Sequence, residues 1–227
     1  MRALAFLAAA VALTVAGLFV LTTVVRLHVD PDHAPISILL SAQVALVLFT
    51  VVAPSALVAV TLRPAPLDFG WGRPSRPRQL LAGVVGGALL MSLVIGSIAA
   101  LGGVRLSAPS IAPLIALRYG AAYAAIFGLT AISEEGLFRG YVLIQLSRAV
   151  SFWPAAVVTS LLFLATHLFH ANETVMGLAQ VGLFGLVMAF SVWKSGGLWF
   201  ALGFHAAWDF TETFVYGVPD SGLASAA

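Results

Sequence analysis

Seven long apolar stretches restrict the fold of this chain more than any other feature of its sequence. At about 20 residues, an apolar helix is long enough to cross a bilayer. In lipid only helices and closed barrels satisfy their backbone hydrogen bonds, and these continuous runs lack the alternation of barrel strands. The sequence therefore predicts an all-α fold, a polytopic transmembrane helical bundle of about seven to eight helices. The stretches run approximately over residues 3–25, 36–62, 79–101, 111–133, 152–170, 174–193 and 197–217.

Composition agrees with a multi-pass protein of the cell membrane that lies in the lipid bilayer. Of the 227 residues, 61% are hydrophobic and only 9% are charged, whereas soluble proteins have about 25%. The net charge of +2 does not indicate a nucleic-acid partner, because the 11 basic residues lie at the ends of the apolar stretches. The absence of cysteine excludes disulfides and thiolate chemistry, so any metal would need His, Asp or Glu ligands.

The polar breaks divide the chain into three predicted regions. Residues 1–105 are expected to form amino-terminal transmembrane helices, with an arginine-rich loop at 63–78 that the positive-inside rule makes cytoplasmic. Counting spans from this loop predicts a cytoplasmic amino terminus, with the first stretch as an uncleaved span rather than a signal peptide. Residues 106–217 are expected to form a helical core, and residues 218–227 a flexible tail.

Two carboxylates and a guanidinium interrupt the apolar pattern after the fourth stretch. Glu135 and Arg139 are four residues apart, so on a helix they share one face and can neutralise each other. Glu134 points about 100° away and is left to act as a general base. Ionisable groups in membrane segments are costly, which favours function, but solvated side chains at a helix end remain an alternative. Either the fourth helix continues past Arg148 and the hairpin tip protrudes into the cytoplasm, or a deep wet cavity reaches the site. We expect the first, because Arg139 and Arg148 need water nearby.

His167 ends the fifth stretch, where a single histidine is often only a packing residue. A turn near Ser151 would form an antiparallel hairpin that brings residue 134 level with residue 167. His205, Asp209 and Glu212 lie at i, i+4 and i+7, so they form one stripe that must face the bundle. That stripe could bind a metal, stabilise an oxyanion or hold the helices together. The sequence contains neither an HExxH nor a GxSxG motif.

Three motifs in this order resemble the family of CAAX proteases and bacteriocin-processing enzymes. They are EExxxR at 134–139, FxxxH at 163–167 and HxxxD at 205–209, within a match over roughly 110–217. This family, CPBP, is also called the Abi or type II CAAX prenyl endopeptidase family, and residues 196–210 are especially similar to its last motif. The resemblance implies an intramembrane endopeptidase whose site lies between helices.

By position, the resemblance implies a role for each motif residue. Glu134 matches the catalytic glutamate, with Glu135 as its neighbour and Arg139 closing the motif. His167 and His205 match the second-motif and third-motif histidines. Asp209 lies where the eukaryotic prenyl proteases have Asn; because a carboxylate cannot donate a hydrogen bond, Asp favours a metal-ligand or histidine-orienting role. A divalent metal such as zinc, held by His167, His205 and Asp209, is one version of the site.

The leading hypothesis is hydrolysis of a peptide bond in a membrane-associated peptide or protein. Glu134, assisted by His167, would activate a water, while His205 and Asp209 hold a metal or the developing oxyanion. A proton- or ion-coupled transporter is an alternative, although the chain has no internal repeat of the kind that marks many transporters. A non-catalytic membrane partner or immunity protein is another alternative.

Overall fold

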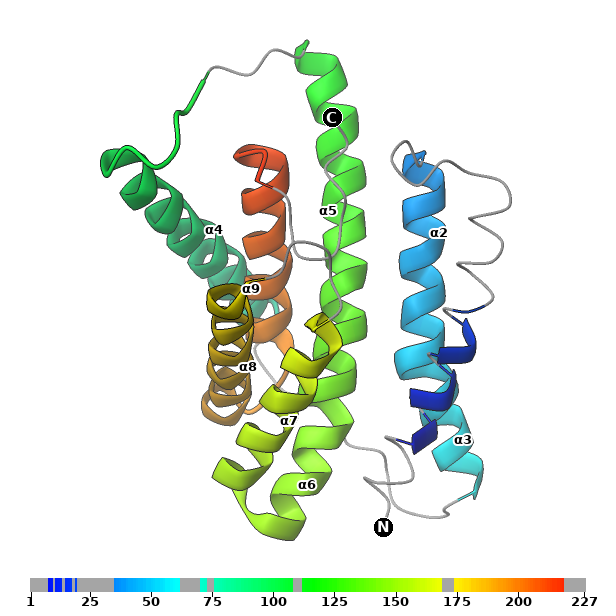
Figure 1. The fold of residues 1–227 in the computed structure, drawn as a ribbon. Coiled ribbons are helices and arrows are strands. Elements are labelled where there is room, and N and C mark those ends of the chain that lie inside the picture. Colours follow the sequence, from blue (N-terminus) through cyan, green and yellow to red (C-terminus); the bar gives the residue numbers. More distant parts are fainter. Residues whose placement is uncertain are drawn as a thin grey trace.

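Every secondary-structure element among the described residues is a helix (Figure 1), which confirms the predicted all-α fold. The structure is a computed structural model that describes residues 35–61, 70–72, 76–107, 112–168 and 174–218, with residues 8, 9, 11–13, 15–17 and 19. Most of the predicted first span and of the loop at 63–78 lies outside the described residues. So does the predicted tail beyond residue 218.

The helices follow the predicted stretches closely, and three of them continue into π-helical segments. Within the described residues, four helical runs are long and apolar enough to cross a membrane: Ile36–Leu57, Arg76–Ala100, Pro113–Val150 and Val175–Ser195. The elements in chain order are α2 (Ile36–Val47), η2 (Leu48–Val52), α3 (Ala53–Thr61), α4 (Arg76–Ala100), α5 (Pro113–Glu135), η3 (Gly136–Val142), α6 (Leu143–Val150), α7 (Phe152–His167), α8 (Val175–Ser195), α9 (Trp199–Phe210) and η4 (Thr211–Val215).

The fourth predicted stretch becomes the longest helical run of the described chain. It begins at Pro113, where proline at the first helical position needs no hydrogen-bond partner for its nitrogen. It continues without a break through η3 and α6 to Val150, which confirms that the helix extends past Arg148. At Ser151 the backbone takes a positive φ of 75°, and α7 starts at the next residue.

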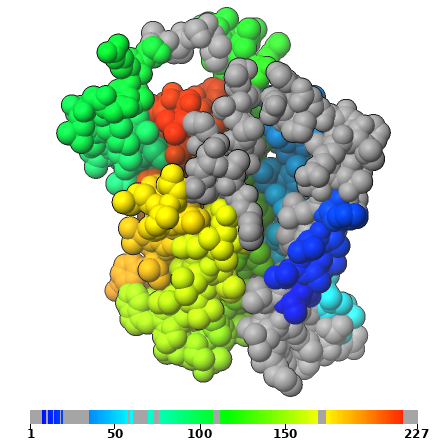
Figure 2. Space-filling view, viewed as in Figure 1, coloured from blue at the N-terminus to red at the C-terminus, as the bar shows by residue number. Residues whose placement is uncertain are grey.

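The α6 and α7 helices form the predicted hairpin, seen at the lower end of the face in Figure 2. The rings of Phe138 and Phe163 lie 5.4 Å apart in an edge-to-face contact. In an antiparallel hairpin, a step of four residues back along one helix is matched by a step of four residues forward along the other. A pairing of residue 138 with residue 163 therefore implies a pairing of residue 134 with residue 167. The ring contact therefore has the register that the sequence predicts.

Helix α9 lies between α4 and α5 and also packs against α8 (Figure 1). Its crossing with α4 depends on glycines. A Cβ atom on Gly83 or Gly87 of α4 would collide with the carbonyl oxygen of Phe200 or Phe204, respectively. A Cβ on Gly203 of α9 would collide with the carbonyl oxygen of Leu80. Small residues let helix backbones approach closely in lipid, and here they position α9, which carries His205 and Asp209.

Candidate functional site

A fully buried ion pair forms the base of the site. Arg139 Nη1 lies 3.2 Å from Glu135 Oε1, and both side chains have an exposed fraction of 0%. The guanidinium also lies over the ring of Phe163, with 4.2 Å between Cζ and the ring centroid. This geometry confirms that Glu135 and Arg139 neutralise each other. Removing either partner would leave a buried charge, which costs several kcal/mol in proteins.

Glu135 has a second partner that the sequence did not predict. Its Oε1 atom lies 2.8 Å from Nδ1 of His205, on a helix 70 residues later in the chain. A carboxylate oxygen accepts, so Nδ1–H of His205 donates and the ring is held with Nε2 turned to the opposite side. Glu135 therefore connects the charge of Arg139 to the orientation of His205.

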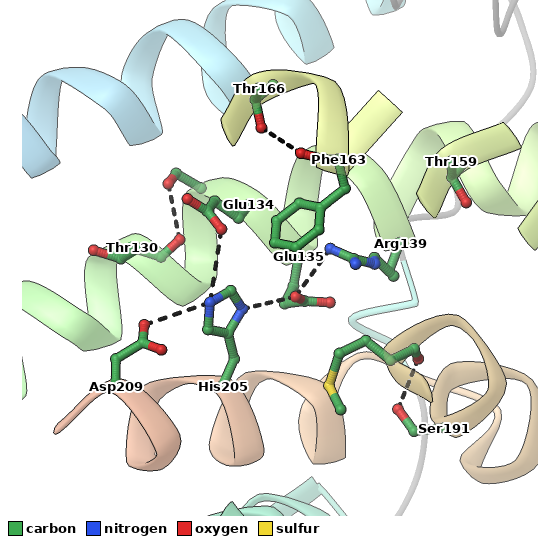
Figure 3. Close-up of polar contacts among 12 residues, drawn as sticks. Thr130, Glu134, Glu135, Arg139, Thr159, Phe163, Thr166, Ser191, His205 and Asp209 are labelled. Carbon is green, nitrogen blue, oxygen red and sulfur yellow. Dashed lines mark hydrogen bonds and ion pairs between the residues drawn. The ribbon is translucent and has the colours of Figure 1, made fainter. Parts of the chain in front are cut away.

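Two further carboxylates face Nε2 of His205 (Figure 3). Glu134 Oε2 lies 3.6 Å and Asp209 Oδ2 lies 3.4 Å from this nitrogen. The side chains of His205 and Asp209 are only 6% and 7% exposed, whereas that of Glu134 is 30% exposed. The structure therefore brings Glu134, Glu135 and Asp209 together around one imidazole, and Glu134 is the carboxylate that a small molecule reaches most easily.

His167 lies in the same aromatic environment. Its Nδ1 atom is 3.0 Å from the carbonyl oxygen of Phe163 and 3.1 Å from Oγ1 of Thr166. Since a carbonyl can only accept, Nδ1 carries the hydrogen, and Nε2 is the acceptor nitrogen when the ring is neutral. The Phe163 ring lies 4.8 Å from the His167 ring and 6.3 Å from the His205 ring. The ring of Phe163 thus neighbours both predicted site histidines.

Phe184 of α8 is a site neighbour that sequence reasoning missed. Its ring meets the His205 ring edge-to-face at 5.0 Å, and it lies 6.3 Å from the ring of Phe163. The neighbouring rings of Phe163 and Phe184 shield the imidazole of His205, and its nitrogens face the carboxylates. No signal in the sequence distinguishes Phe184 from the lipid-facing aromatics of the same apolar stretch.

Gly185, the next residue of α8, makes room for Arg139. A Cβ atom at this position would lie 3.0 Å from Arg139 Nη2 and 3.1 Å from Ser160 Oγ. Both polar atoms, with Arg139 Nε and Glu135 Oε2, are buried and make no hydrogen bond within the described part of the chain. The fit around the guanidinium is therefore tight on the α8 side.

Among the described residues, no three side chains of the His, Cys, Asp and Glu types are grouped as a metal ion requires. Nδ1 of His205 is already used by Glu135, so only Nε2 of that ring could bind a metal. The metal-ligand role of His167, His205 and Asp209 stays a prediction. The polar residues His170 and Glu173, which precede α8, lie outside the described residues.

Comparison with known proteins points to one family. Residues 119–211 match the model of the family described as type II CAAX prenyl endopeptidase Rce1-like. The matched segment contains all six predicted site residues, and it confirms the family that the three motifs suggested. The chain is also similar to an uncharacterized 24.3 kDa protein of Escherichia coli, with 41% identity over 75 residues. That alignment covers 32% of this chain and about a third, 34%, of the relative. No solved structure matches.

Proposed function

Because residues 119–211 form an Rce1-like domain, we propose that this chain is an intramembrane endopeptidase that hydrolyses a peptide bond of a membrane-associated substrate. The family supports a protease of the CAAX type in general. The specific mechanism rests on the cluster around His205. The observation that carries it is the contrast between Glu134, which is 30% exposed, and the buried carboxylates of Glu135 and Asp209.

In the proposed reaction, Glu134 acts as the general base. Its carboxylate takes a proton from a water molecule, and the water oxygen forms a bond to the carbonyl carbon of the substrate. The C–N bond then breaks, and the proton held by Glu134 passes to the leaving amine nitrogen. The second proton of the water stays with the new carboxyl group, so atoms and charges balance. His167, whose neutral ring has an acceptor Nε2, assists in orienting the water.

The buried residues position the base and the transition state. Arg139 holds Glu135, and Glu135 holds Nδ1 of His205. Because Asp209 is a carboxylate and cannot donate, we assign it to orienting Nε2 of His205 rather than to binding the oxyanion. A protonated Nε2 of His205, 3.6 Å from Glu134 Oε2, would then be a donor that can stabilise developing negative charge.

The test compares membrane proteomes of cells that carry the wild-type chain or Glu134→Gln. We expect a cleavage product that is present with the wild-type chain and absent with the variant. Gly128→Ala on the same helix is the control, because a Cβ there meets no atom within 4 Å. Unchanged cleavage in Glu134→Gln would contradict the proposal. A proton-coupled transport activity that is lost in Glu134→Gln, without any peptide product, would favour the transporter instead.

A further inference from the structure

A cluster of aromatic side chains and one lysine lies at the end of the molecule where α7 begins and α8 ends. The rings of Phe152 and Trp193 stack 4.9 Å apart, and Trp153 lies 6.3 Å from Phe190. Lys194 Nζ lies 4.7 Å over the Trp193 ring. Trp153, Phe190 and Trp193 are exposed. These five residues, Phe152, Trp153, Phe190, Trp193 and Lys194, are called the collar below.

The described charges at the collar end are all basic. Arg148 is exposed near the end of α6, and Arg76 and Arg78 are exposed at the start of α4. The start of α4 belongs to this end, because Gln79 Nε2 donates to the carbonyl oxygen of Ser195 at 3.0 Å. Tryptophan and lysine are enriched at membrane interfaces, and basic side chains attract anionic headgroups. The collar therefore fits a layer of anionic phospholipid headgroups.

The distance from the collar to the site follows from helix geometry on two separate elements. Phe184 contacts the His205 ring, and Trp193 lies nine residues later on α8, which is about 14 Å at the rise of a helix. Phe163 also lies beside the His205 ring, and Phe152 is eleven residues earlier on α7, or about 16 Å. Both helices place the site about half a bilayer thickness from the collar.

The opposite end gives a matching distance. Tyr216 follows His205 by eleven residues, which corresponds to about 16 Å, or slightly less because η4 is wider than an α-helix. On α5, the exposed pair Arg118 and Tyr119 lies further out, about 24 Å from Glu135. The hydrocarbon core of a bilayer is about 30 Å thick. A layer of this thickness fits between the collar at one end and Tyr119 and Tyr216 at the other.

We propose that the collar sits in the anionic headgroup layer of one leaflet, and that the carboxylates around His205 consequently lie near the middle of the hydrocarbon. By the excess of basic residues at the collar end, this leaflet is the cytoplasmic one. This placement concerns the lipid contacts of the chain and does not depend on the peptidase chemistry.

Because the chain has no cysteine of its own, a single introduced cysteine is the only site that a thiol-reactive label can modify. Single cysteines at Met176, Leu183, Val187, Phe190 and Trp193, all exposed on α8, would each carry a nitroxide in the full chain. The labelled protein is placed in vesicles of phosphatidylcholine and phosphatidylglycerol, and depth is measured from relaxation by oxygen and by a water-soluble nickel chelate. We expect the greatest depth at Leu183, next to the site level, and decreasing depth toward both Met176 and Trp193. A maximum at Phe190 or Trp193 would overturn the proposal.

A second measurement tests the headgroup partner. A fluorophore on a cysteine at Phe190 is quenched by nitroxides attached to the headgroup of either phosphatidylglycerol or phosphatidylcholine. We expect stronger quenching by the anionic lipid, and Lys194→Gln should reduce this preference about fivefold, whereas Lys194→Arg keeps it. Equal quenching by phosphatidylglycerol and phosphatidylcholine, in the chain with Lys194 and in both Lys194 variants, would contradict the proposal that the collar binds anionic headgroups. Spin coupling between labels at Phe190 that grows with protein density would show that a second copy covers the collar, which also contradicts the proposal.

Discussion

Glu134 and Glu135 are neighbours in the chain but have different surroundings. Glu135 is fully buried between Arg139 and His205, whereas Glu134 is partly exposed and approaches Nε2 of His205. The two residues point in different directions around the helix axis, yet both reach the same imidazole. Replacing each glutamate should therefore have a different consequence.

For Glu134→Gln we expect a large loss of activity with little loss of stability. An amide cannot take the proton from water, so the rate should fall by about 10²–10⁴. Quantified cleavage product in reconstituted vesicles measures the rate, and thermal unfolding in detergent measures the stability. A variant that unfolds as readily as Glu135→Gln would assign a structural role to Glu134.

For Glu135→Gln we expect destabilisation. The change leaves Arg139 buried without its counter-charge, and breaking a buried ion pair costs about 3–5 kcal/mol. Thermal unfolding in detergent should therefore shift to a clearly lower temperature. If the double variant Glu135→Gln with Arg139→Met is more stable than Glu135→Gln alone, the loss comes from the unpaired charge. Equal stability of the wild-type chain and Glu135→Gln would contradict this account.

Gly185→Ala should disturb the same pair from the α8 side. The new methyl group would lie 3.0 Å from Arg139 Nη2, and overpacking of this kind costs about 1–3 kcal/mol. Gly128→Ala is the control, because a Cβ there meets no atom within 4 Å. We expect a lower unfolding temperature for the first variant and an unchanged or higher one for the second. The same shift in both would show that the Arg139 contact is not the cause.

At the scale of elements, α9 depends on α4 for its position. Gly83 and Gly87 allow the two backbones to touch, so Gly83→Leu should separate the helices and move His205 away from Glu134. We expect loss of both stability and activity. Gly96→Leu on the same helix is the control, since a Cβ at Gly96 meets no atom within 4 Å. Activity retained in Gly83→Leu, measured as cleavage product, would show that α9 is positioned by other contacts.

Hydropathy predicts the described helices well because a span must be apolar for about 20 residues, and helical spacing predicts the Glu135–Arg139 pair. Contacts between distant residues are less accessible from one sequence. The bond from Glu135 to His205 depends on how α5 packs against α9. The role of Phe184 depends on how α8 packs against α9, and that of Gly185 on how α8 packs against η3 and α7. The π-helical segments η3 and η4 likewise have no residue pattern that predicts them.

At the scale of the whole molecule, the metal question can be settled by chelation. Because the proposed reaction uses Glu134 as the base and needs no metal, we expect cleavage to continue after exhaustive chelation. The measurement is product formation by the reconstituted chain with chelator, and with chelator followed by zinc. Loss of product that zinc restores would contradict the expectation and would support His167, His205 and Asp209 as ligands.

The spacing of the site's charges also has a consequence for how the chain enters the membrane during synthesis. Glu135 and Arg139 leave the ribosome four residues apart, so the pair can cross into lipid as a neutral unit long before His205 is made. His205 and Asp209 are likewise four residues apart on α9 and enter together. Each helix therefore carries its own local partner through the insertion step, and the contacts of Glu134 and Glu135 with His205 form only when α9 arrives.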